Sequence, residues 1–208
     1  MRRLVVVLAI VLCTTVGAAE TPGGKETTVS AVAARVAAVD LLCGEFKQQK
    51  HLKALARPLV TTGKYVFVAG QGILWQVQSP YPARLLVTKD ELIQWDDTGE
   101  PLKLGYGKTP VFQALSNVFL TMFKGDIAAL RNTFDLSATM TKDSWHLVLI
   151  PNYDILTAAI SKLTVSGGRH VEQITIHEPR GDQTLIRLYN PRTETCELDD
   201  VEKAYFAR

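Results

Sequence analysis

The sequence lacks the short motifs that mark the common catalytic and nucleotide-binding sites. It contains no Gly-x-Ser-x-Gly nucleophile elbow, no Walker loop and no Gly-x-Gly-x-x-Gly segment that leads into a helix. Gly70-Gln71-Gly72 lies between two strand-like runs, so we interpret it as a turn and not as a phosphate-binding loop. The sequence therefore predicts neither an enzyme of these classes nor a bound cofactor.

Histidines and clustered carboxylates are few and poorly spaced for chemistry. The four histidines show no metal-ligand spacing; they are His51, His146, His170 and His177. The densest acidic group surrounds a polar turn; it comprises Glu91, Asp96, Asp97 and Glu100. Solvated or packed side chains explain both sets, so no metal site is predicted. A nucleophilic pair of Cys43 with a histidine is the remaining catalytic alternative, and the expected place of Cys43 on the apolar face of a helix disfavours it.

The chain also lacks a long apolar run and a strong net charge. Its first 19 residues have the form of a cleavable signal peptide: Arg2-Arg3, an apolar Leu4 to Leu12, then Gly17-Ala18-Ala19. The alternative is a retained membrane anchor. Leu12 before Cys13 argues against lipidation of that cysteine. We expect a single mature domain over residues 20–208, secreted after cleavage of the signal peptide.

Charge excludes one class of partner. The chain has 23 basic and 21 acidic residues, and loss of Arg2 and Arg3 leaves a mature protein with no net charge. No cluster of Lys and Arg with interleaved aromatics is present. Because nucleic-acid binding depends on basic surfaces, we predict no nucleic-acid partner. We also expect the protein to be a monomer.

Two of the three cysteines remain after cleavage of the leader. Cys43 and Cys196 are candidates for a disulfide in an oxidising compartment, where it would tie the first helix to the C-terminal segment. Two free, partly buried thiols are the alternative. The sequence leaves both open.

The periodicity of the chain is mainly that of strands. A helix is expected from Thr27 or Thr28 to Cys43, ended by Gly44, because apolar residues recur at three and four. Strands are expected over 45–55, 60–69, 72–78, 83–88, 91–95, 101–104, 134–141, 144–150, 160–166, 170–178 and 183–190. Thr109-Pro110 begins a central helix with a shorter one over 127–132, and a last helix is expected over 199–205. Sequential strands of this kind form a curved antiparallel sheet, with apolar helices against its concave side.

Bulky apolar residues are what the sequence has in excess. Tyr65, Phe67, Ile73, Trp75 and Val77 share one strand parity, and we expect that face to line a cavity. A fully packed core is the alternative reading. The remaining candidates for a lining that binds acyl chains are Trp95, Phe112, Leu115, Phe119, Met122, Phe134, Leu136 and Met140.

The order of these segments resembles the periplasmic outer-membrane lipoprotein carriers, the LolA-like proteins. The resemblance rests on a secreted helix, a strand with Phe-x-Gln, then Gly-x-Leu-Trp and a proline; these are Phe46, Gln48, Gly72, Leu74, Trp75 and Pro80. It implies a mainly β fold with helices (α+β), in which one curved antiparallel sheet forms an unclosed β-barrel with an N-terminal helix and a central helical lid. It also implies an apolar cavity for lipoprotein acyl chains, an energised inner-membrane exporter and an outer-membrane acceptor.

One departure from the family pattern bears on the cargo. The best-known carriers have an arginine between the tryptophan and the proline, which links barrel to lid, whereas this chain has Gln76-Val77-Gln78-Ser79. The leading hypothesis is therefore a carrier of lipoprotein acyl chains, with a carrier of another lipid or hydrophobic product as a variant of it. A periplasmic interaction module that binds no lipid is the second hypothesis. An enzyme that acts on acyl substrates is the third.

Overall fold

The structure is a computed structural model that describes residues 22–95, 101–105 and 110–207. The predicted signal peptide, residues 1–19, lies outside the described residues. Among the described helices, none combines the length and the apolar character needed to cross a membrane.

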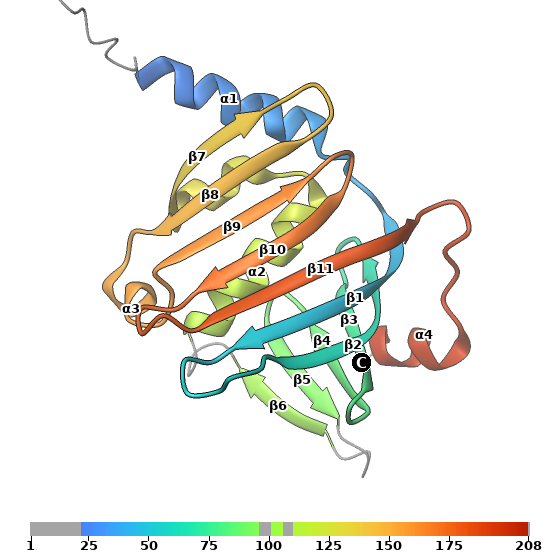
Figure 1. Cartoon of the computed structure of the whole chain (residues 1–208). Coiled ribbons are helices and arrows are strands. Elements are labelled where there is room, and N and C mark those ends of the chain that lie inside the picture. The colour runs from blue at the N-terminus through green and yellow to red at the C-terminus, as the bar shows by residue number, and fades with distance from the viewer. Residues whose placement is uncertain (1–21, 96–100, 106–109, 208) are drawn as a thin grey trace, which may run out of the picture.

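An eleven-stranded antiparallel sheet dominates the fold, in the order β6-β5-β4-β3-β2-β1-β11-β10-β9-β8-β7. Neighbouring strands along the chain pair with one another, except that β1 and β11 join the two halves. Strands β6 and β7 remain as two separate edges, so the sheet curves without closing (Figure 1). This confirms the expected fold. The strands are β1 Leu41–His51, β2 Leu59–Val68, β3 Gly72–Ser79, β4 Ala83–Val87, β5 Glu91–Trp95, β6 Pro101–Gly105, β7 Phe134–Met140, β8 Trp145–Pro151, β9 Lys162–Gly167, β10 Val171–His177 and β11 Gln183–Arg192.

Helices occupy both sides of the sheet. The sheet wraps around the central helix α2, Pro110–Lys124, and α1, Pro22–Arg35, runs beside β7 (Figure 1). A 3₁₀ helix η2, Ile127–Asn132, continues from α2, and the four-residue helix α3, Asp154–Thr157, was not predicted. The C-terminal helix α4, Asp200–Phe206, packs on the outer, convex face, where its Tyr205 and Phe206 cover the β3–β5 strands.

Strand alternation explains how this sheet has a core on each face. In β8, Trp145, Leu147 and Leu149 are buried while His146 and Ile150 are exposed. In β2, Tyr65 and Phe67 enter the large concave core, whereas Val66 enters a small convex cluster with Cys43 and Cys196. Because successive side chains point to opposite faces, apolar residues of both parities require cover on both sides, which the helices and the C-terminal segment supply.

The predicted end of the first helix, at Cys43, is wrong. Val29, Val32 and Val36 are buried, but α1 stops at Arg35, and Cys43 and Gly44 lie in strand β1. The reason is tertiary: β1 pairs with β2 on one side and β11 on the other, so its backbone gains two ladders that a helix would forgo. Residues 52–55, predicted as strand, follow the end of β1.

Cys43 and Cys196 form a disulfide with a Cα–Cα distance of 5.5 Å. Since Cys43 belongs to β1, the bond ties a central strand to the C-terminal segment and not the first helix to it. It holds that segment on the convex face beside Val66 and Leu198.

Candidate functional site

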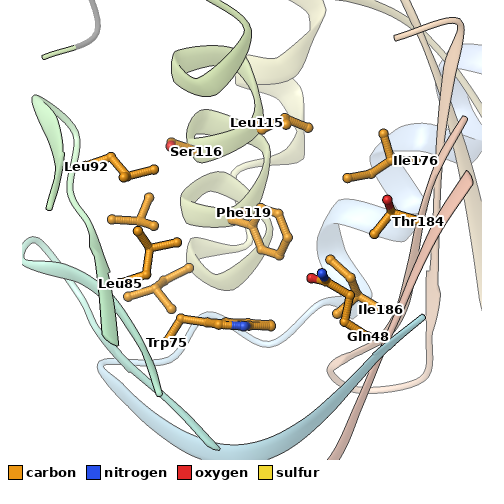
Figure 2. Close-up of a pocket in the computed structure, with 12 residues that line it drawn as sticks. Gln48, Trp75, Leu85, Leu92, Leu115, Ser116, Phe119, Ile176, Thr184 and Ile186 are labelled. Carbon is orange, nitrogen blue, oxygen red and sulfur yellow. The ribbon is translucent and has the colours of Figure 1, made fainter. Parts of the chain in front are cut away.

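An apolar cavity of about 230 Å³ lies between the concave face of the sheet and α2 (Figure 2). Its wall contains no titratable side chain, because the three polar members are neutral. The lining residues are Gln48, Ile73, Trp75, Leu85, Val87, Leu92, Leu115, Ser116, Phe119, Ile176, Thr184 and Ile186.

One wall comes from three neighbouring strands in register. Trp75 of β3 pairs with Leu85 of β4, Ile73 pairs with Val87, and Val87 pairs in turn with Leu92 of β5. Paired residues point to the same face of a sheet, so this register lays five apolar side chains on the concave side. Their neighbours of opposite parity belong to the convex cluster instead.

The opposite wall comes from strands far away in sequence. Gln48 of β1 pairs with Ile186 of β11, and Thr184 of β11 pairs with Ile176 of β10. Thr184 is buried, with 8 % of the residue exposed. The pairing of β1 with β11 therefore supplies the wall opposite β3, β4 and β5, from strands that are not their neighbours in sequence.

Helix α2 covers the space between these walls. Leu115 and Phe119 are four residues apart and thus share one helix face, which points into the space between the two walls in Figure 2. The rings of Phe119 and Trp75 meet edge to face with centroids 6.1 Å apart. Trp75 packs in turn on Phe46, at 4.0 Å between centroids, and on Tyr65, at 5.9 Å. An aromatic row therefore runs from the cavity wall into the packed core.

Four of the thirteen side chains predicted to line a cavity do line this one: Ile73, Trp75, Leu115 and Phe119. Most others on the concave side belong to the adjoining core. Tyr65, Phe67, Met122 and Phe134 are buried in it, and Val77 and Leu136 pack against it half-buried.

Three predicted residues have other positions. Trp95 does not line the cavity: it is buried on the convex face, because its pairing with Arg84 gives it the parity opposite to Leu85 and Leu92. Met140 is 37 % exposed at the end of the edge strand β7. Phe112 lies in the first turn of α2, and its side chain is outside the described residues.

Sequence reasoning missed eight lining residues. Leu85, Val87 and Leu92 could have been found from strand parity, since they alternate with the convex Leu86 and Ile93. Gln48, Ile176, Thr184 and Ile186 depend on the pairing of β1 with β11 and β10, which no local pattern reveals. Ser116 lies next to a predicted residue on α2.

The convex face of the same strands is held by polar and aromatic contacts to α4. Gln76 donates a hydrogen bond from Nε2 to Oε1 of Glu202 at 2.6 Å. Tyr205 meets Trp95 edge to face at 4.7 Å between centroids and lies 5.6 Å below the guanidinium carbon of Arg84. Gln76 lies in the stretch where the best-known carriers have their arginine. In this protein its side chain points to the convex face and binds Glu202 of α4.

Within the part of the chain that the structure describes, no three His, Cys, Asp or Glu side chains are grouped to hold a metal ion. The cavity on the concave side is therefore a neutral, mainly apolar space.

The comparisons with known proteins agree with this geometry. The family model of outer membrane lipoprotein carrier protein LolA matches residues 37–201. A DUF1329 family protein from Desulfovibrio piger is similar in structure at 15 % identity, with a TM-score of 0.51, covering 88 % of this chain and 96 % of its own.

Two further solved structures are less similar. A LolA superfamily protein from Nitrosomonas europaea has 10 % identity and a TM-score of 0.48, with 85 % of this chain and 96 % of its own covered. An outer membrane lipoprotein-sorting protein domain from Vibrio parahaemolyticus, described as putative, has 11 % identity and a TM-score of 0.47, with 88 % and 100 % covered. No curated protein matches the sequence significantly. At such identities the structural likeness concerns the fold alone.

Proposed function

The chain belongs to the family of outer membrane lipoprotein carrier protein LolA, and from this premise we propose that it is a periplasmic carrier that shields acyl chains of lipoproteins between the inner and the outer membrane. The observation that carries the proposal is the neutral cavity of about 230 Å³ under α2. A variant of the proposal is a carrier of another lipid, because the stretch from Gln76 to Ser79 lacks the arginine that the best-known carriers have there.

The energetics of acyl transport favour such a cavity. Burying each methylene of an acyl chain is worth about 0.8 kcal/mol, so a lipid anchor in water needs a comparable apolar surface to cover it. Nine of the twelve lining side chains are apolar, and they come from both walls and from α2. A chain held there would contact carbon on all sides.

The cavity must enlarge to take a whole acyl chain. Ligand pockets usually measure about 300–1,000 Å³, so a space of 230 Å³ accommodates a part of one chain. Helix α2 is the element that can yield, since Phe119 and Phe123 hold it to the sheet through aromatic packing on Trp75, Tyr65 and Phe67. Burial of apolar surface is non-directional, so contacts with an acyl chain can replace these contacts when α2 moves.

The direction of transport would come from membrane partners. The sequence has no nucleotide-binding motif, so an energised inner-membrane exporter must deliver the cargo and an outer-membrane acceptor must take it. These partners are part of the proposal.

Native mass spectrometry of the protein from periplasm tests the proposal, with lipoprotein or lipid adducts as the expected result. Leu115→Lys places a charge in the cavity and should abolish the adducts, while Asn117→Lys places the same charge on the exposed side of α2 and should retain them. A protein without adducts, or equal loss in both variants, contradicts acyl binding in this cavity and favours an interaction module.

A further inference from the structure

A second cavity, of about 580 Å³, opens between β10 and β11 at the end of these strands away from the apolar cavity. Its character is different, because eight of its eleven lining residues carry a polar or charged group. The lining residues are Tyr65, Ser166, Arg169, His170, Val171, Glu172, Gln173, Arg187, Leu188, Tyr189 and Pro191.

The pocket opens where strands β10 and β11 separate. The β10–β11 ladder stops at the pair Gln173 and Arg187, but β11 continues along β1 to Arg192. The β1–β11 register also shifts between Cys43 and Glu45, where Asn190 adopts a φ of 53°. Bulges of this kind occur preferentially at the rims of barrels and next to functional sites.

The hydroxyl of Tyr65 lies at the floor of this opening. Tyr65 is 1 % exposed, and its ring stacks between Trp75 and Phe123, so the hydroxyl is the part left to face the pocket. Gly44 makes room for it, because a Cβ there would come within 2.5 Å of the hydroxyl oxygen. Within the described residues no hydrogen bond occupies this hydroxyl, so it is available to donate to a group in the pocket.

The charge around this floor is net positive. Arg169 and Arg187 contribute two guanidinium groups and Glu172 one carboxylate. Arg187 donates from Nε to Oε1 of Gln173 at 3.4 Å, and its other N–H groups are available within the described structure. Burial raises the pKa of Tyr65 to about 12, so its hydroxyl stays a donor. Burial and the neighbouring Arg169 lower the pKa of His170, against the influence of Glu172, so its ring is neutral at pH 7.

We propose that this pocket binds a phosphate ester, with Arg169 and Arg187 on its oxygens and the Tyr65 hydroxyl donating to another. Arginine binds phosphate oxygens through paired N–H groups, and these two arginines come from different elements, the turn before β10 and strand β11, so they can engage different oxygens of a tetrahedral anion. Glu172 at the rim is an acceptor for an ammonium substituent, and the volume exceeds what a bare phosphate fills. The ester is either a lipid headgroup or a soluble phosphate compound.

Isothermal titration of the mature protein with inorganic phosphate and with glycerophosphoethanolamine tests the site without acyl chains, and thus separately from the proposed carrier function. Binding by either probe is expected. Tighter binding of glycerophosphoethanolamine indicates a lipid headgroup as the source, and tighter binding of inorganic phosphate indicates a soluble one. No binding of either probe at millimolar concentration overturns the proposal.

Variants locate the binding. Arg169→Gln with Arg187→Gln should weaken it about tenfold or more, since charge-assisted bonds are lost, and Tyr65→Phe should weaken it severalfold while preserving the ring packing. Arg180→Gln, in the hairpin at the other end of β10, removes the same charge and should leave binding unchanged. Equal weakening by Arg180→Gln would reveal non-specific attraction and reject the site. Bound anion should also raise the pKa of His170 in an NMR titration.

Discussion

The side chain of Gln76 donates a 2.6 Å hydrogen bond to Glu202, which joins the outer face of strand β3 to helix α4. One residue earlier, Trp75 faces the apolar cavity from the same strand. Neighbouring residues of β3 therefore connect the cavity wall on one side with the C-terminal segment on the other.

Replacing Gln76 should loosen α4. Gln76→Ala removes a hydrogen bond to a charged acceptor and should lower the free energy of unfolding by about 1–2 kcal/mol. The loss is moderate because the bond is only half-buried. Gln78→Ala, on the same face but exposed, is the matched control and should change stability by less than about 0.5 kcal/mol. Urea unfolding measures both, and equal losses would contradict the role of this bond.

Reduction of the disulfide should destabilise the whole fold. Cys43 and Cys196 are 153 residues apart, and closing so long a loop stabilises a protein by up to about 5 kcal/mol on the chain-entropy model. Urea unfolding with and without reductant measures the loss. The Cys43→Ala, Cys196→Ala double variant should be insensitive to reductant, and a reductant effect in that variant would point to another cause.

A methyl group at Gly44 should collide with Tyr65. Its Cβ would lie 2.5 Å from the hydroxyl oxygen and 2.6 Å from the ring, so Gly44→Ala should cost about 1–3 kcal/mol through overpacking. Gly168→Ala, whose nearest atoms would be 3.3 and 3.4 Å away, should cost less. In a double-mutant cycle, Tyr65→Leu should reduce the cost of Gly44→Ala; additive effects would show that the two positions do not interact.

Phe119 should limit the size of the apolar cavity. Phe119→Ala removes the ring that meets Trp75 edge to face, so we expect a larger space and a stability loss of about 3 kcal/mol, at the low end for phenylalanine because the ring is only partly buried. Native mass spectrometry with fatty acids of increasing length should show longer chains retained by the variant. Asn117→Ala, on the exposed side of α2, should behave as the unaltered protein does.

Two histidines should make the fold less stable in acid. Burial lowers the pKa of His170 and of His177 below the ordinary value of 6.5, aided by Arg169 and Lys162 respectively. The unfolded chain then binds more protons than the folded one as the pH falls through 6.5, so stability declines below that pH and is restored above it. The His170→Gln, His177→Gln variant should show a smaller decline between pH 7 and 5 in urea unfolding. An unchanged slope would contradict this linkage.

The sequence by itself determined the strands, the parity of β2 and β3 and the central helix. Those features depend on contacts between near neighbours in the chain: alternation sets the face of Tyr65 and Trp75, and spacing at three and four sets the face of Leu115 and Phe119. The tertiary structure decided what local pattern does not contain. The pairing of β1 with β2 and with β11 converts residues 41–43 from expected helix to strand, and its pairing with β11 brings Gln48 beside Ile186. The same long-range pairing places Cys43 against Cys196 and opens the polar pocket where β10 leaves β11. Backbone hydrogen bonds between distant segments outweigh the helical preference of a few residues, and for that reason the cavity walls follow from the assembled sheet.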